Sequence, residues 1–193
     1  MTARRALALV AALCALATLV LGLVVANRAP GALDTRATDV TGRLSRPLLD
    51  VLVLPTEPYL LIPAIALVAG ACLFRHRRRD ALLAVAGPAL AVALNTWVLK
   101  PLFGRMKDAT LAYPSGHTVS LVTVLVVLVL LARPKLVTTL VAVFLLCCAT
   151  IGLVGLGYHY LTDVAGGVCF ATFVVTGMRA ALTPRLAPAP STG

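Results

Sequence analysis

The sequence predicts an all-α polytopic membrane protein with six transmembrane helices, and three observations support this fold class. Of its 193 residues, 60% are apolar and only 12% are charged, and the mean hydropathy is +0.99. A soluble domain is about 45–50% apolar and about 25% charged, so an ordinary soluble globule is excluded. The apolar residues also gather into six runs that approach the roughly 20 residues needed to cross a bilayer.

The predicted helices cover residues 6–27, 59–74, 81–99, 117–132, 136–156 and 163–182. The first has an apolar core longer than that of a signal peptide, so we expect an uncleaved anchor helix. The third should stop at Pro101, because proline interrupts helical hydrogen bonding. The uncharged stretch between Lys135 and Asp163 is too long for one span, so it should hold the fifth helix and, after it, a turn at Gly155, Gly157 and Tyr158.

The segment at residues 28–50 is too polar to span a membrane, since it mixes arginine with aspartate. Within it, Leu33, Ala37, Val40 and Leu44 recur at the spacing of one helix face. This pattern predicts an amphipathic helix that lies at the membrane interface.

A dense basic cluster occupies residues 75–79, and further Lys and Arg residues flank the other apolar runs. The positive-inside rule places this cluster in the cytoplasm. Six spans then leave both termini cytoplasmic. We expect one membrane domain over residues 1–183 and a disordered Pro-rich tail over residues 184–193.

This topology brings together side chains that are far apart in the sequence. Lys100 ends the third span and His117 begins the fourth, while His159 and Asp163 lie between the fifth and sixth. All four are therefore expected at the outer membrane face, at the extracytoplasmic ends of the helices. We infer that any chemistry of this protein takes place there.

If the formal net charge of +10 lay on the surface of a soluble protein, it would suggest that the protein binds nucleic acid. Here the basic residues lie in short loops between apolar runs, and no recognition motif accompanies them, so we expect the bilayer and not nucleic acid as the partner. The five cysteines fall inside apolar runs without zinc-ligand spacing. These cysteines therefore indicate no zinc site, and the sequence indicates no oligomeric state.

The tetrapeptide Pro114–Ser115–Gly116–His117 stands at a predicted helix start. Ser115 can cap that helix, and the free N–H groups of a helix N-terminus favour an anion. An equally simple interpretation is a plain capping turn with His117 at the membrane interface.

His159 precedes Asp163 by four residues. On one helical turn this spacing lets a carboxylate orient an imidazole, as the third member of a catalytic triad does. The alternative is an interfacial His and Asp beside two tyrosines. Zinc is disfavoured, because no closely spaced histidine pair fixes its geometry.

Three cations, Lys100, Arg105 and Lys107, lie on the face that the positive-inside rule leaves poor in them. Together with two histidines and a helix N-terminus they would form a phosphate site. Attraction to anionic lipid head groups explains them equally well.

In order along the chain, Lys100 and Lys107, then Pro114–His117, then His159 and Asp163 resemble the signature of the type 2 phosphatidic acid phosphatase (PAP2) superfamily. The resemblance implies a six-helix lipid phosphate phosphatase that needs no metal or other cofactor. His159 would be the nucleophile that forms a phosphohistidine, Asp163 would orient it, and His117 would protonate the leaving group. The implied phosphate-binding residues are Lys100, Lys107, Ser115 and Gly116.

The chain departs from the family pattern at two places, where Lys107–Asp108 replaces Arg-Pro and Gly152–Leu153 replaces Ser-Arg. A lysine is a point charge and cannot form the bidentate contacts of arginine. Arg105 could replace one missing arginine. We therefore expect a phosphatase of the cell membrane that hydrolyses a phosphomonoester or diphosphate of a lipid such as phosphatidate, phosphatidylglycerophosphate or polyprenyl phosphate. The alternatives are a catalytically weak or inactive relative that binds or moves a phosphorylated lipid, and a small channel or assembly subunit.

Overall fold

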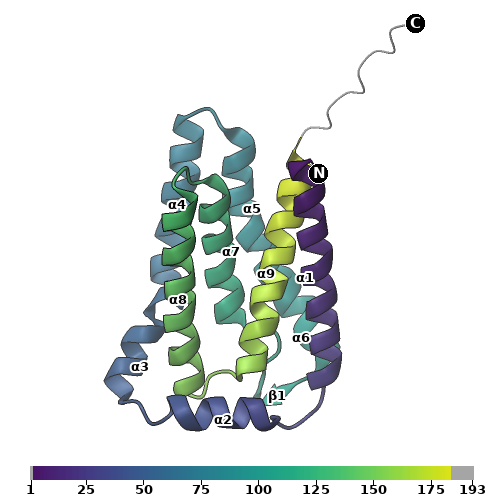
Figure 1. The fold of residues 1–193 in the computed structure, drawn as a ribbon, viewed down its shortest axis with the longest axis vertical. Helices are drawn as coiled ribbons and strands as arrows, with labels where there is room; N and C mark the ends of the chain where they lie inside the picture. Colours follow the sequence, from purple (N-terminus) through teal and green to yellow (C-terminus); the bar gives the residue numbers. More distant parts are fainter. Residues whose placement is uncertain (1, 184–193) are drawn as a thin grey trace, which may run out of the picture.

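Long apolar helices account for most of the chain, as expected where a backbone in lipid must satisfy its own hydrogen bonds. The computed structural model describes residues 2–183, and the predicted Pro-rich tail lies outside them (Figure 1). Its long helices are α1 (Ala3–Val25), α4 (Pro58–Phe74), α5 (Arg78–Leu94), α7 (Gly116–Leu131), α8 (Lys135–Gly155) and α9 (Leu161–Leu182). Shorter elements are α2 (Ala32–Thr41), α3 (Arg46–Val53), η1 (Leu54–Thr56), η2 (Asn95–Leu99), α6 (Lys100–Phe103), β1 (Met106–Lys107) and β2 (Thr110–Leu111).

Within the described residues, five helical segments are long and apolar enough to cross a membrane. They are Ala3–Val25, Arg46–Phe74, Arg78–Phe103, Lys135–Gly155 and Leu161–Leu182. The sixth predicted span corresponds to α7, which is apolar but has only 16 residues. Helix α7 lies in the middle of the bundle, in contact with α4, α5, α8 and α9 (Figure 1).

The prediction that the third span stops at Pro101 is wrong. The helix continues through the π-helical turn η2 into α6, and it ends at Gly104, whose φ of +59° only glycine adopts without strain. A π turn is wider than an α turn, and here it ends at Leu99, two residues before the proline, whose ring would clash with the previous turn of a regular helix. Lys100 therefore lies inside this helical segment and not beyond it.

The amphipathic segment forms two helices, α2 and α3, instead of one. Helix α2 lies across one end of the bundle (Figure 1), and Leu33 and Val40 of its predicted apolar face lie outside the bundle interior. Leu33 and Val40 are 62% and 58% exposed, whereas Asp34 is 1% exposed. The side chain that α2 buries most deeply is thus a carboxylate, which requires a partner.

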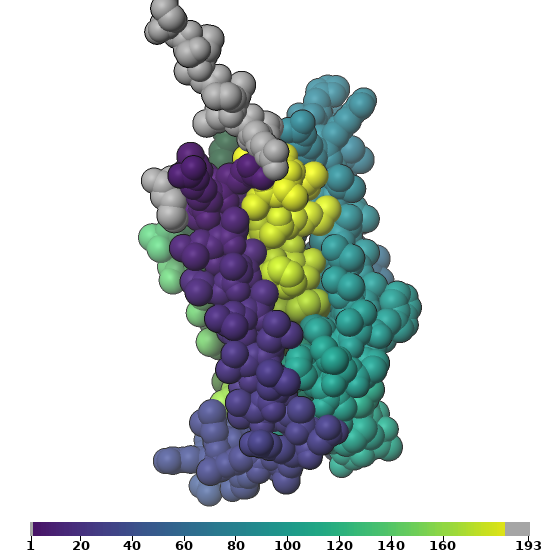
Figure 2. Space-filling view, turned by 90° about the vertical axis from the view of Figure 1, so that its right-hand side faces the viewer, coloured from purple at the N-terminus to yellow at the C-terminus, as the bar shows by residue number. Residues whose placement is uncertain are grey.

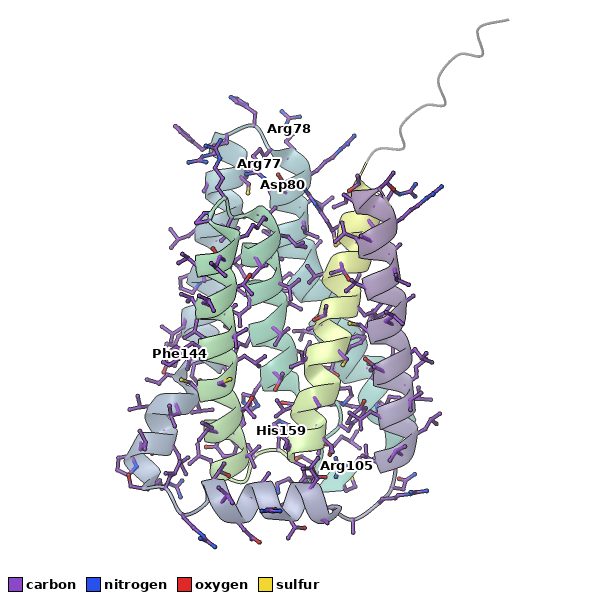
Figure 3. All side chains as sticks on the ribbon, viewed as in Figure 1. Arg77, Arg78, Asp80, Arg105, Phe144 and His159 are labelled. Atoms are coloured by element: carbon purple, nitrogen blue, oxygen red, sulfur yellow. The ribbon has the colours of Figure 1, made fainter. Side chains whose placement is uncertain are left out.

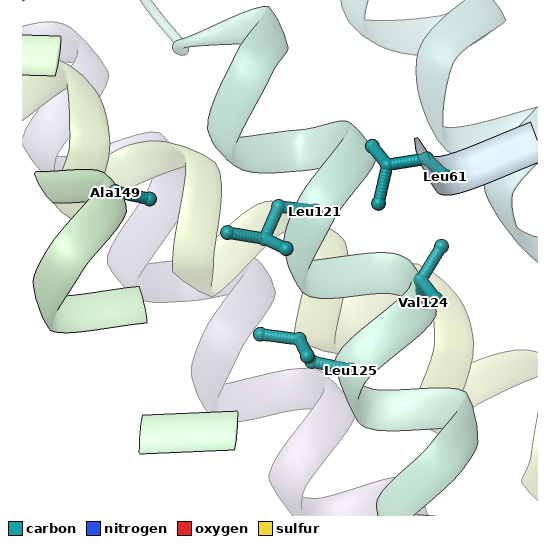
Figure 4. Close-up of a cluster of buried hydrophobic side chains, with 5 residues drawn as sticks. All are labelled: Leu61, Leu121, Val124, Leu125 and Ala149. Carbon is teal, nitrogen blue, oxygen red and sulfur yellow. The ribbon is translucent and has the colours of Figure 1, made fainter. Parts of the chain in front are cut away.

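Helices from the two ends of the sequence pack side by side. Figure 2 shows α1 in purple running beside α9 in yellow, and the two helices are in extensive contact. A separate apolar cluster joins α4, α7 and α8 through Leu61, Leu121, Val124, Leu125 and Ala149 (Figure 4). Large apolar side chains on the outer faces, such as Phe144 at 65% exposure, point away from the bundle (Figure 3).

The two ends of the bundle differ in chemistry. Arg77, Arg78 and Asp80 mark one end, whereas Arg105 and His159 mark the other (Figure 3). At the first end, both Arg77 and Arg179 form ion pairs with Asp80. The clustered basic residues thus lie at the end opposite the predicted site.

Candidate active site

A cavity of about 580 Å³ opens at the end of the bundle that α2 crosses. Residues from η1, α4, α5, η2, α6, β2, α7, the β1–β2 turn and the α8–α9 loop meet around it. Its polar lining residues include Asn95, Thr96, Lys100, Asp108, Thr110, His117, Ser120 and His159, and Gly116 also lines it. The cavity thus gathers several residues that the sequence singled out, although they are spread over some 60 positions.

Two histidines lie against each other in this cavity. Nδ1 of His117 is 3.4 Å from Nε2 of His159, and the ring centroids are 5.5 Å apart at an interplanar angle of 66°. The Tyr158 ring stacks on His117 at a centroid distance of 6.1 Å. The two ring nitrogens are thus in direct contact, and a group bound beside them would lie within reach of both rings.

Local capping explains why His117 lies where it does. Ser115 is the N-cap of α7, and its Oγ accepts hydrogen bonds from the N–H and hydroxyl of Thr118. The backbone N–H of Ser115 donates to the carbonyl of Asp163 at 3.0 Å, which joins the start of α7 to the start of α9. Ser115 is fully buried, so it acts here as a cap, while the amide end of α7 reaches the cavity at Gly116.

His159 precedes α9 and is 7% exposed. Oδ2 of Asp163 lies 3.9 Å from Nδ1 of His159, which is near but beyond hydrogen-bond distance. The same oxygen accepts the N–H of Tyr160 at 2.9 Å and so caps α9. Among the described residues, Nδ1 of His159 has no hydrogen-bond partner.

Burial lowers the pKa of His159 to about 3, and the neighbouring His117 and Lys100 add to this effect. A free histidine has a pKa of about 6.5. The His159 imidazole is therefore neutral at neutral pH, so one of its ring nitrogens carries a lone pair. A neutral imidazole is the form that can act as a nucleophile or base.

The predicted phosphate-binding cations do not share one environment. Lys100 lines the cavity, and its Nζ donates to the carbonyl of Leu111 at 2.7 Å. Lys107 lies outside the cavity lining, with its Nζ 3.8 Å from the centroid of the Tyr160 ring. Among the described residues that line the cavity, Lys100 is the one lysine or arginine.

Arg105 does not line the cavity, and the idea that it replaces a missing arginine does not fit its position. Its side chain is 1% exposed and forms ion pairs with Asp34 at 2.7 Å and Asp163 at 2.6 Å. It also donates to the hydroxyl of Thr162 at 2.6 Å. Two carboxylates and a hydroxyl already hold this guanidinium, so a phosphate would have to displace them.

The sequence interpretation missed two buried polar residues. Asn95 is 1% exposed, lines the cavity, and donates from Nδ2 to the carbonyl of Pro114 at 3.4 Å. A polar side chain within a predicted span is a recognised sign of function, and this sign could have identified Asn95. Asp34 gave no comparable signal, because it stands in a segment with several other charges.

In the part of the chain that the structure describes, no group of three or more His, Cys, Asp and Glu residues could hold a metal ion. The positive groups at the cavity are the Lys100 ammonium and the amide end of α7. Both can bind phosphoryl oxygens.

The fold and this site define a helical membrane protein whose candidate chemistry depends on two adjacent histidines at one end of the bundle. The chain belongs to the PAP2 superfamily, whose sequence profile matches residues 61–186. It is accordingly a helical, multi-pass membrane protein of this superfamily.

A solved structure has a similar fold. It is the crystal structure of the first transmembrane PAP2 type phosphatidylglycerolphosphate phosphatase from Bacillus subtilis. The TM-score is 0.72, with 88% of this chain and 94% of that chain covered at 20% sequence identity. A comparison with curated proteins gives no match.

Proposed function

We propose that this protein hydrolyses a phosphomonoester or diphosphate of a membrane lipid through a phosphohistidine at His159. One observation carries the proposal: His159 lies 3.4 Å from His117 in a cavity that also contains Lys100. A nucleophile, a proton donor and a cation are thus within reach of one phosphoryl group.

In the first step, Nε2 of His159 attacks phosphorus, and the bond from phosphorus to the lipid oxygen breaks. His117 in its protonated form gives its proton to the departing alkoxide. The carboxylate of Asp163 lies on the Nδ1 side of His159 at 3.9 Å, which favours a proton on Nδ1 and leaves the lone pair on Nε2.

In the second step, water attacks the phosphohistidine and the bond from nitrogen to phosphorus breaks. His117, now neutral, accepts the proton of the water, and His159 regains its lone pair. Lys100 and the amide end of α7 at Gly116 stabilise the negative charge on the phosphoryl oxygens in both steps.

The test is phosphate release by the detergent-purified protein from phosphatidate, phosphatidylglycerophosphate and polyprenyl phosphates, with EDTA present. We expect release from at least one lipid, and we expect His159→Gln to abolish it. Release that persists in His159→Gln would show that His159 is not the nucleophile. A matched control is His76→Gln at the opposite end of the bundle, which should keep the rate of the unmodified protein.

A second candidate function is binding or transport of a phosphorylated lipid without turnover. A specific observation favours it: Arg105 is held by two carboxylates and Lys107 lies outside the cavity, while the Asp108 side chain adds a negative charge to the lining. Saturable binding of a lipid phosphate with no phosphate release, between about pH 5 and pH 8, would establish this function instead.

We further propose six spans, with α7 as the sixth, both termini in the cytoplasm and the cavity at the outer face. The clustered arginines at the opposite end of the bundle support this orientation through the positive-inside rule. The test uses a cysteine-free variant with a single cysteine at Ala109, near the cavity, or at His76, in the basic cluster. In intact cells, an impermeant maleimide should label Ala109→Cys and not His76→Cys, and the reverse pattern would contradict the orientation.

A further inference from the structure

A buried network of charges connects α2 to the start of α9. Oδ2 of Asp34 pairs with Arg105 at 2.7 Å, and Arg105 pairs with Oδ1 of Asp163 at 2.6 Å. The three side chains are at most 2% exposed. They come from α2, from the segment between α6 and β1, and from the first turn of α9.

Thr162 completes the network on both sides. Its hydroxyl donates to Oδ2 of Asp34 at 2.8 Å and accepts a hydrogen bond from Arg105 at 2.6 Å, while its backbone N–H donates to Oδ1 of Asp34 at 2.9 Å. Both oxygens of Asp34 are thus bound, and the guanidinium is held in one orientation. The Tyr160 ring covers that guanidinium at 4.7 Å.

Stability alone does not account for such a network. Moving charges out of water is expensive, and replacement of buried ion pairs by apolar residues is often neutral or even stabilising. The end point of this network is more informative. Asp163 uses Oδ1 for Arg105, which leaves Oδ2 directed to the N–H of Tyr160 and to the Nδ1 side of His159.

We propose that Asp34 and Arg105 are positioning residues for the reaction at His159. Asp34 fixes the Arg105 guanidinium, Arg105 fixes the carboxylate of Asp163 and keeps it charged, and Asp163 sets the proton position on His159. This inference rests on the proposed function. It makes α2, which precedes the family-matched residues 61–186, a part of the active site.

The decisive variant is Asp34→Asn, which keeps the size of the side chain and removes its charge. We expect kcat to fall ~10- to 100-fold, the loss that is typical when the hydrogen-bond partner of a metal-binding residue is removed, with KM nearly unchanged because Asp34 does not line the cavity. The matched control is Asp39→Asn, an exposed aspartate on the same helix, which should behave like the unmodified protein.

A double-mutant cycle tests the order of the chain of contacts. If Asp34 acts through Asp163, then Asp34→Asn should cost little more in a protein that already carries Asp163→Asn. Full additivity of the two losses would overturn the proposal. So would a normal kcat per folded molecule in Asp34→Asn with only a lower unfolding temperature, because that result defines a merely structural role.

Thr162 supplies a second pair of variants in case Asp34→Asn does not fold. Thr162→Val keeps the volume and removes the hydroxyl that binds Asp34 and Arg105, whereas Thr162→Ser keeps that hydroxyl. We expect the serine variant to retain activity and the valine variant to lose it. Equal activity of the two variants would contradict the network.

A measurement that does not require catalytic turnover tests this inference independently of the proposed function. Nitrogen-15 NMR of His159 reports which ring nitrogen bears the proton. We expect an Nδ1–H tautomer in the unmodified protein and a mixture of tautomers in Asp34→Asn. If Asp34→Asn changes the tautomer but the unmodified protein releases no phosphate, the proposed phosphatase activity is refuted and the positioning role of the network stands. If Asp34→Asn leaves the tautomer unchanged, the positioning role is refuted.

Discussion

Nδ1 of His117 lies 3.4 Å from Nε2 of His159, although the two residues are 42 positions apart in the sequence. The contact forms because the capped start of α7 and the loop before α9 are joined by the hydrogen bond from Ser115 to the carbonyl of Asp163. If the two histidines have different roles, their variants should fail at different steps.

We predict that His117→Gln keeps the nucleophile and still forms the phosphohistidine, although slowly because it lacks the acid for the alkoxide, and that it hydrolyses this intermediate slowly because it also lacks the base for water. Removal of a general acid or base typically costs ~10²–10⁴-fold in rate. Acid-labile radioactive phosphate from a labelled lipid should therefore accumulate on His117→Gln, in detergent micelles quenched with alkali. His159→Gln is the control and should carry no label. Equal labelling of both variants would contradict the assignment of roles.

The two lysines predicted to bind phosphate should differ sharply in effect. Lys100 lines the cavity, whereas Lys107 covers the Tyr160 ring outside the lining. Loss of a preorganised charge next to the reacting group can cost ~10²–10³-fold in rate, so Lys100→Met should lose that much and Lys107→Met much less. Steady-state kinetics of both variants on the same lipid would decide. A larger loss for Lys107→Met would show that the β1–β2 turn closes over the substrate.

The contact between Gly166 of α9 and Tyr113 should be essential for stability. A Cβ at position 166 would overlap the ring of Tyr113, which is fully buried and donates from its hydroxyl to the carbonyl of Thr18 at 2.6 Å. Overpacking typically costs ~1–3 kcal/mol, so Gly166→Ala should lower the unfolding temperature. Gly70→Ala is the control, because nothing lies within 4 Å of a Cβ there, and it should leave the temperature equal or slightly higher. Equal temperatures for the two variants would contradict the prediction.

The low pKa of His159, about 3, predicts that its imidazole stays neutral throughout the usual assay range. In a His76→Gln background, the nitrogen NMR signals of His159 should not titrate between about pH 8 and pH 5, whereas an ordinary histidine titrates near pH 6.5. Between about pH 6.5 and pH 3 the unfolded chain binds a proton that the folded chain does not bind, so acid should also favour unfolding in that window. An inflection of the His159 signal near pH 6.5 would show that the ring is hydrated.

The positions of the helices could be predicted because each helix is determined by the residues of its own segment. Apolar runs bounded by charges mark where a chain enters and leaves a membrane, and inside lipid the backbone of such a run forms a helix. The third span shows where this reasoning fails. A proline normally ends a helix, but the π turn at η2 carries this helix past Pro101, and nothing in the local sequence pattern indicates that turn.

The candidate site was predictable to the extent that it depends on the order of helix ends. The alternation of spans places Lys100, His117 and His159 at one end of the bundle, and the structure brings them into one cavity. Alternation of spans gives the end of the bundle at which a residue lies, but not the direction of its side chain. Lys107 was therefore grouped with Lys100, although its ammonium lies over Tyr160 and outside the cavity.

Sequence by itself thus determined the fold class, the helices and the residues that gather at the cavity, since hydropathy and span order follow from composition along the chain. Only the tertiary structure decided the partners of Arg105. Its guanidinium was expected to face a phosphate, but Asp34 and Asp163 hold it in the interior. Asp34 reaches Arg105 because α2 lies across the end of the bundle. A buried charge pairs with whatever opposite charge the packing of distant segments places beside it.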